Sequence, residues 1–134
     1  MLDKDQFTYF LDLEVNRARR YQNFFCLLVL RIEPLSDGFK DGLKDDYQSM
    51  RRLIAEEVRE SDLIGLLEEN RMVILLPYAD SVAGDRAKSR LEDSLKYYDF
   101  EHKGYEVMIQ RICFPIDGTN TAGILKKTEV GEIE

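Results

Sequence analysis

An unbroken run of seven apolar residues, from Phe24 to Leu30, lies near the start of the chain. The run is too short for a buried helix and contains aromatic and β-branched residues, which is typical of a strand covered on both faces. A strand of this kind needs helices packed on each side of its sheet. The sequence therefore predicts an α/β fold in which this strand lies near the middle of the sheet.

Two further apolar runs, Leu63–Leu67 and Met72–Leu76, are separated only by residues 68–71. This spacing predicts a β-hairpin at the centre of the sheet. Tyr105–Phe114 is expected to be the last long strand, ending before Pro115. A hairpin inside a chain otherwise joined by crossovers predicts an α/β (α+β) fold with a mixed central sheet, helices packed on it and a ferredoxin-like core.

The segments between these strands carry apolar residues at three- and four-residue steps, which predicts helices. The expected helices span residues 3–21, 43–59, 81–96 and 121–129. Asp80 or Ser81 is the expected cap of the third helix. Its inner face is expected to consist of residues four apart: Ala83, Ala87, Leu91 and Leu95.

The chain length of 134 residues is that of one ordinary domain, so residues 1–134 are expected to form a single domain with a core over about 5–127. The formal net charge is -7. An acidic surface repels a phosphate backbone, so nucleic acid is not an expected partner.

The first residues lack the charged and then apolar pattern of a signal peptide, and no apolar run is long enough to span a bilayer. A cytoplasmic location without membrane contact is therefore expected. Cys26 and Cys113 lie in apolar strand-like runs without CxxC spacing. Buried reduced thiols are expected there, rather than a disulfide or a metal site, and no cofactor is expected.

Three segments together resemble one family. Residues 10–21 run directly into the first strand, residues 59–67 are followed by the hairpin strand 73–77, and Phe114-Pro115-Ile116-Asp117-Gly118 follows the last core strand. In order and spacing they resemble the GGDEF domains, the diguanylate cyclases, over roughly residues 5 to 127. The resemblance implies a nucleotide-cyclase-like fold and a role in cyclic di-GMP signalling.

That family joins two GTP molecules into cyclic di-GMP with a Gly-Gly-Asp/Glu-Glu-Phe signature at the hairpin tip. The five corresponding positions here are Glu68, Glu69, Asn70, Arg71 and Met72. Glycines allow a close approach to phosphate, and the fourth residue of the signature is an acid that binds Mg²⁺. Glu68 and Glu69 instead indicate a solvated turn, and Arg71 removes the metal ligand.

A second metal ligand is lost independently. The family's aspartate at the end of the first strand falls on Arg31, and a guanidinium cannot bind Mg²⁺. The family's guanine- and substrate-holding motifs have no counterpart between Pro34 and Tyr47, where Lys44 takes the place of an aspartate. The resemblance therefore implies a degenerate, catalytically inactive domain without a metal. We expect Arg31 to pair with an acid near the lost metal position, one of Glu33, Glu68 or Glu69.

The resemblance also implies a counterpart of the family's product-inhibition site. Its Arg-x-x-Asp motif is matched by Arg59 and Asp62, five residues before the signature positions. The resemblance places Arg90 at the family's further arginine on the helix after the hairpin, with Arg86 one turn earlier. Arginine can donate to O6 and N7 of guanine, and a carboxylate can accept from its N1-H and amino group. A solvated ion pair at a helix end explains Arg59 and Asp62 equally well.

Three functions therefore stay open. The first is an inactive GGDEF-like signalling domain that binds cyclic di-GMP through Arg59, Asp62, Arg90 and Arg86. The second is a nucleotide-free module that dimerises or contacts a signalling protein through its first helix or an open sheet face. The third, an active cyclase, requires magnesium-dependent nucleotide binding, which the lost ligands argue against. His102 is interpreted as a surface residue.

Overall fold

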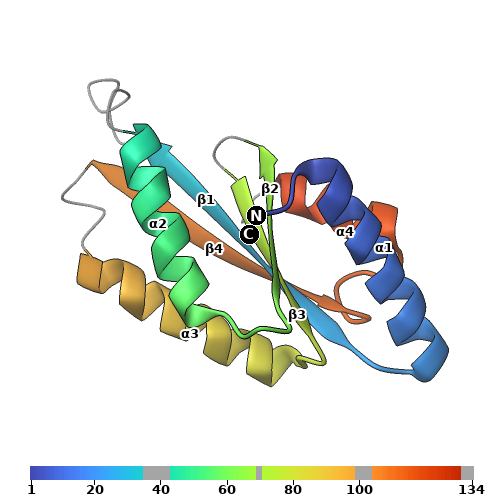
Figure 1. Cartoon of the computed structure of the whole chain (residues 1–134). Coiled ribbons are helices and arrows are strands. Elements are labelled where there is room, and N and C mark those ends of the chain that lie inside the picture. Colours follow the sequence, from blue (N-terminus) through green and yellow to red (C-terminus); the bar gives the residue numbers. More distant parts are fainter. Residues whose placement is uncertain (35–42, 69–70, 99–103, 131–134) are drawn as a thin grey trace.

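The computed structural model describes residues 1–34, 43–68, 71–98 and 104–130. The elements follow one another in the expected order (Figure 1). They are α1 (Lys4–Tyr21), β1 (Phe25–Pro34), α2 (Leu43–Glu57), β2 (Leu63–Glu68), β3 (Arg71–Pro77), α3 (Ser81–Tyr98), β4 (Tyr105–Phe114) and α4 (Thr121–Val130).

The four strands form one sheet in the order β2-β3-β1-β4, and the three strand pairs are antiparallel. The unit β1-α2-β2-β3-α3-β4 with this order is the ferredoxin-like arrangement, so the expected α+β fold with a ferredoxin-like core is confirmed. Each crossover connection skips one strand, which leaves antiparallel strands as neighbours. Parallel pairing in the described residues is confined to a short bridge between Leu2 and Gly65.

Helices cover both faces of the sheet, with α2 and α3 on one side and α1 and α4 on the other (Figure 1). Side chains of β1 alternate between the two cores: Leu28 and Leu30 face α2 and α3, whereas Leu27 and Val29 face α1 and α4. All four are 0% exposed, and each contributes about 1.5–3 kcal/mol by its burial. The prediction of a central, doubly covered strand is confirmed.

The helix ends explain why α1 and α3 start where they do. Asp3 and Gln6 form a capping box at the start of α1. Asp80 accepts a hydrogen bond of 2.8 Å from the amide of Ala83, so Asp80 is the cap of α3. Ala83 itself is exposed, contrary to expectation, and the buried position in that turn is Gly84. A Cβ at Gly84 would lie 2.8 Å from Sγ of Cys26, so the close packing of α3 on β1 requires a glycine there.

The prediction of reduced thiols is wrong, because Cys26 and Cys113 form a disulfide. Both residues are buried, as expected. They are directly opposite one another in the antiparallel register of β1 and β4, with their Cα atoms 4.1 Å apart. Cross-strand neighbours come this close only in the folded sheet. Because the two cysteines are 87 residues apart in the sequence, their spacing could not predict the disulfide.

The helices of the described ranges are too short or too polar to cross a lipid bilayer.

Candidate functional site

The Arg-x-x-Asp motif forms a tight turn between α2 and β2. The backbone amide of Asp62 donates to the carbonyl of Arg59 over 3.0 Å, and the amide of Arg59 donates to Oδ2 of Asp62 over 2.8 Å. The aspartate side chain therefore closes the turn and is held in one orientation. Only 3% of it is exposed.

The guanidinium of Arg59 lies on the surface next to this carboxylate. Its Nη2 is 3.5 Å from Oδ1 of Asp62, and the arginine side chain is 64% exposed. An ion pair this long and this solvated contributes little to stability. The solvated ion pair that the sequence analysis gave as an alternative is therefore present. Because this ion pair is weak, the side chain of Arg59 can rotate to another acceptor with little loss of free energy.

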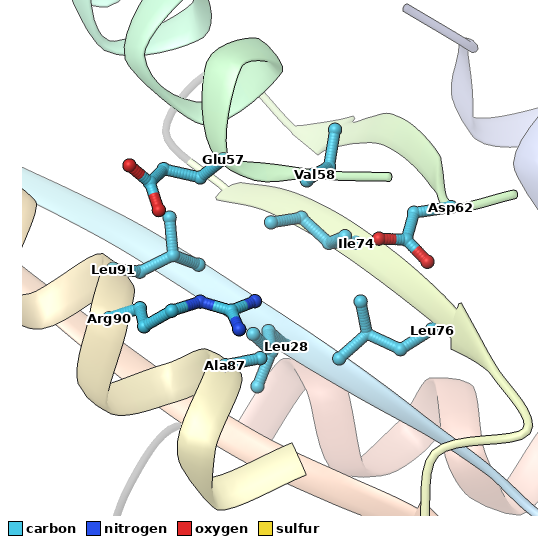
Figure 2. Close-up of a pocket in the computed structure, with 9 residues that line it drawn as sticks. All are labelled: Leu28, Glu57, Val58, Asp62, Ile74, Leu76, Ala87, Arg90 and Leu91. Carbon is cyan, nitrogen blue, oxygen red and sulfur yellow. The ribbon is translucent and has the colours of Figure 1, made fainter. Parts of the chain in front are cut away.

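Arg90 and Asp62 line one pocket between α3 and the end of α2 (Figure 2). Figure 2 shows the guanidinium of Arg90 reaching in from α3 and the carboxylate of Asp62 pointing in from the opposite side. Leu28 and Ile74 of the sheet form the apolar floor between them. The cavity volume is about 10 Å³, which is the room of a single water-sized sphere.

Arg86 does not share this arrangement. It is exposed on α3, and the pocket that contains Arg90 and Asp62 is not lined by it. Of the four residues predicted to bind a ligand, the fold thus brings Arg59, Asp62 and Arg90 to one end of α2 and leaves Arg86 apart.

A second cleft begins at the same carboxylate. Arg51, Asp62, Leu63 and Ile64 line it together with the first residues of the chain, and its cavity volume is about 490 Å³. Sequence reasoning missed Arg51. A signal existed, because Arg51 lies two helical turns before Arg59, on the helix that leads into the motif. Leu2 lines the cleft because its backbone pairs with the edge of β2. No sequence pattern predicted this pairing.

The hairpin tip differs from a metal site. Glu68, with 59% of its side chain exposed, forms an ion pair of 3.4 Å with Arg71, which is 5% exposed. Met72 is buried in the core towards α2 and α3. Glu69 and Asn70 lie outside the described residues, as do His102 and residues 35–42, where the substrate-holding motifs were sought.

Arg31 and Arg71 are direct cross-strand partners, and both donate to the backbone carbonyl of Thr128 near the end of α4. Burial lowers the pKa of Arg31, and the positive charge of Arg71 lowers it further, whereas Glu33 and Glu68 act in the opposite direction. The sequence predicted a pair between Arg31 and one of Glu33, Glu68 or Glu69. Glu68 pairs with Arg71, Glu69 lies outside the described residues, and the guanidinium of Arg31 donates to the end of a helix. Glu33 acts on Arg31 through its charge.

Two guanidinium groups therefore occupy the positions to which the resemblance in the sequence assigns metal ligands. The carbonyl end of α4 carries a partial negative charge that stabilises them. They would repel Mg²⁺, and the described residues contain no group of three side chains suited to a metal ion. These residues do not fit the metal of the family.

Four helices packed on a ferredoxin-like antiparallel sheet of four strands make up a nucleotide-cyclase-like fold. Among nucleotide-cyclase-like folds, solved structures of GGDEF domains are similar to this one. A DGC protein from Thermotoga maritima has a TM-score of 0.83 at 15% identity, over 96% of this chain and 93% of that one. The GGDEF domain of TpbB (YfiN) from Pseudomonas aeruginosa has a TM-score of 0.78 at 16% identity, over 96% of this chain and 80% of that one.

A third structure, the GGDEF domain of DgcB from Caulobacter crescentus in complex with c-di-GMP, has a TM-score of 0.71 at 12% identity, over 95% of this chain and 80% of that one. No protein-family model and no curated protein matches the sequence. The chain therefore has the GGDEF domain fold, and the resemblance found in the sequence is confirmed at the level of the fold.

Proposed function

We propose that this protein is a catalytically inactive GGDEF-like signalling domain that binds cyclic di-GMP through Arg59, Asp62 and Arg90. One observation carries the proposal: Asp62 and Arg90 line the same pocket, with the exposed guanidinium of Arg59 beside them. A fixed carboxylate acceptor and two arginine donors match the edges of a guanine base.

The charges at the hairpin support the absence of catalysis. GTP brings a triphosphate and Mg²⁺, and the cyclase reaction needs carboxylates that hold the metal. Here Arg31 and Arg71 replace those carboxylates, and both side chains are engaged with the carbonyl of Thr128. Restoring metal binding would require at least these two positions to change together.

Calorimetric titration with cyclic di-GMP tests the binding proposal. We expect binding in the micromolar range by the wild type, and a loss of at least tenfold in affinity for Arg59→Ala. Arg52→Ala is a matched control, because it removes the same charge from an exposed site that neither pocket includes. GTP with Mg²⁺ should give no product. If titration with cyclic di-GMP gives no heat, the proposal that the protein binds this ligand is wrong. If GTP with Mg²⁺ is converted to cyclic di-GMP, the proposal that the domain is inactive is wrong.

A second candidate, a nucleotide-free interaction module, is favoured by one surface. Three exposed large apolar side chains lie close together in the sequence of α1: Tyr9 at 62%, Phe10 at 38% and Leu13 at 47%. Single exposed apolar residues are ordinary, but adjacent ones on one helix are typical of a contact surface. The diguanylate cyclase SiaD from Pseudomonas aeruginosa, of which this chain covers 55%, was solved with its activator SiaC.

Light scattering after size-exclusion chromatography tests this surface for self-association. Under the second candidate the wild type is a dimer at high micromolar concentration, and Phe10→Asp with Leu13→Asp makes it a monomer. Tyr97→Asp, at a residue 84% exposed on α3, is the control and should leave the dimer unchanged. A wild type that is monomeric at every concentration argues against self-association through α1.

A further inference from the structure

Asp62 stands between two openings of very different size. The cavity towards Arg90 has a volume of about 10 Å³, whereas the cleft towards Arg51 has about 490 Å³. Sites for small molecules usually have volumes of about 300–1,000 Å³. The open cleft beside Arg51 has a volume in this range, whereas the cavity towards Arg90 does not.

The lining of this cleft is mainly apolar, with one donor and one acceptor group. Leu2, Leu63 and Ile64 provide apolar surface, Arg51 provides the guanidinium, and Asp62 provides the carboxylate. The carboxylate is already oriented by its bond from the amide of Arg59. Apolar walls with a few oriented polar groups are typical of sites that bind planar ligands.

One donor of Arg51 has no acceptor among the described residues. Its Nε is buried and makes no hydrogen bond. A buried N–H without an acceptor is unfavourable, and more so when it belongs to a charged group. An acceptor that enters the cleft, together with a small rotation of the side chain, would satisfy this guanidinium.

We propose that the cleft between α2 and the edge of β2 binds a guanine base of the dinucleotide, and that Arg51 is a specificity-determining residue. Arg51 donates to the acceptors O6 and N7, and Asp62 accepts from N1-H and the exocyclic amine. Adenine presents N1 as an acceptor, which Asp62 repels, so the cleft discriminates against adenine. This assignment rests on the proposed binding of cyclic di-GMP, and it adds Arg51 to the residues matched by family resemblance.

Matched arginine substitutions test the assignment by calorimetry on the full chain. Arg51→Ala should weaken cyclic di-GMP binding by tenfold or more, since a paired arginine is replaced by a group that makes no hydrogen bond. Arg51→Lys keeps the charge but not the paired donors, and should recover only part of the affinity. Arg52→Ala removes the same charge from an exposed site outside the cleft and should change the affinity less than threefold. Cyclic di-AMP should bind at least tenfold more weakly than cyclic di-GMP.

Equal affinity of Arg51→Ala and the wild type, with binding lost in Arg59→Ala or Arg90→Ala, would overturn the role of Arg51 and leave the proposed function intact. Equal losses in Arg51→Ala and Arg52→Ala would also overturn it, because the effect would then be one of net charge. Thermal melts of each variant would identify any that is not folded. If Arg51→Ala is not folded, the affinity of Arg51→Lys tests the role of Arg51 in its place.

A second probe separates this inference from the proposed function. GMP is titrated into isotope-labelled protein, and the amide shifts of residues 51, 55 and 62–64 are followed by NMR. If cyclic di-GMP does not bind but GMP shifts these amides in the wild type and not in Arg51→Ala, the proposed function is wrong. The assignment of the cleft as a site for a guanine base is then supported. If neither molecule causes a change, both proposals are overturned.

Discussion

Reduction of the disulfide between Cys26 and Cys113 should destabilise the protein strongly. The bond closes a loop with a sequence separation of 87 residues. The loop-entropy relation gives about 15 cal/mol/K for a loop of this length, which is about 4.6 kcal/mol at 25 °C. For a chain of 134 residues the entropy of unfolding is about 0.28 kcal/mol/K, so the expected fall in Tm is about 16 °C.

The assay is thermal unfolding followed by circular dichroism, with and without a phosphine reductant, beside a thiol count on the unfolded protein. The matched control is Cys26→Ala with Cys113→Ala, whose Tm should not respond to the reductant. Two free thiols in protein never exposed to reductant would refute the disulfide. An oxidised protein whose Tm falls by less than about 3 °C on reduction would refute the entropic reasoning, because that fall corresponds to less than about 1 kcal/mol.

Three further predictions concern stability and are checked by urea unfolding. Gly65→Ala should cost about 1–3 kcal/mol, because the new Cβ would lie 2.7 Å from Cδ1 of the fully buried Phe7; an unchanged midpoint would contradict this packing. Gln22→Gly should add about 0.5–1 kcal/mol, since Gln22 ends α1 with φ 54°, a conformation that favours glycine; lower stability would argue against strain at this residue. Asp3→Ala should cost about 1 kcal/mol through loss of the capping box, and Asp5→Ala, in the first turn of the helix but outside the capping box, should cost less.

The sequence by itself determined the elements and their order. The boundaries of β4 and the start of α2 agree with the predicted ones, because apolar periodicity and the turn residues act locally. The sequence also indicated the GGDEF fold, because the order and spacing of residues 10–21, 59–67 and 114–118 resemble those of that family. The motif residues Arg59 and Asp62 were found for the same reason: they are neighbours in one turn.

Only the tertiary structure decided what depends on contacts between distant segments. The register of β1 against β4 placed Cys26 opposite Cys113, and the register of β1 against β3 placed Arg31 opposite Arg71. The docking of α4 supplied the carbonyl of Thr128, to which both arginines donate, while Glu68 pairs with Arg71. The cleft beside Arg51 likewise exists because Leu2 pairs with β2 more than sixty residues away. A local pattern encodes secondary structure, whereas cross-strand partners and clefts are set by the packing of the whole sheet.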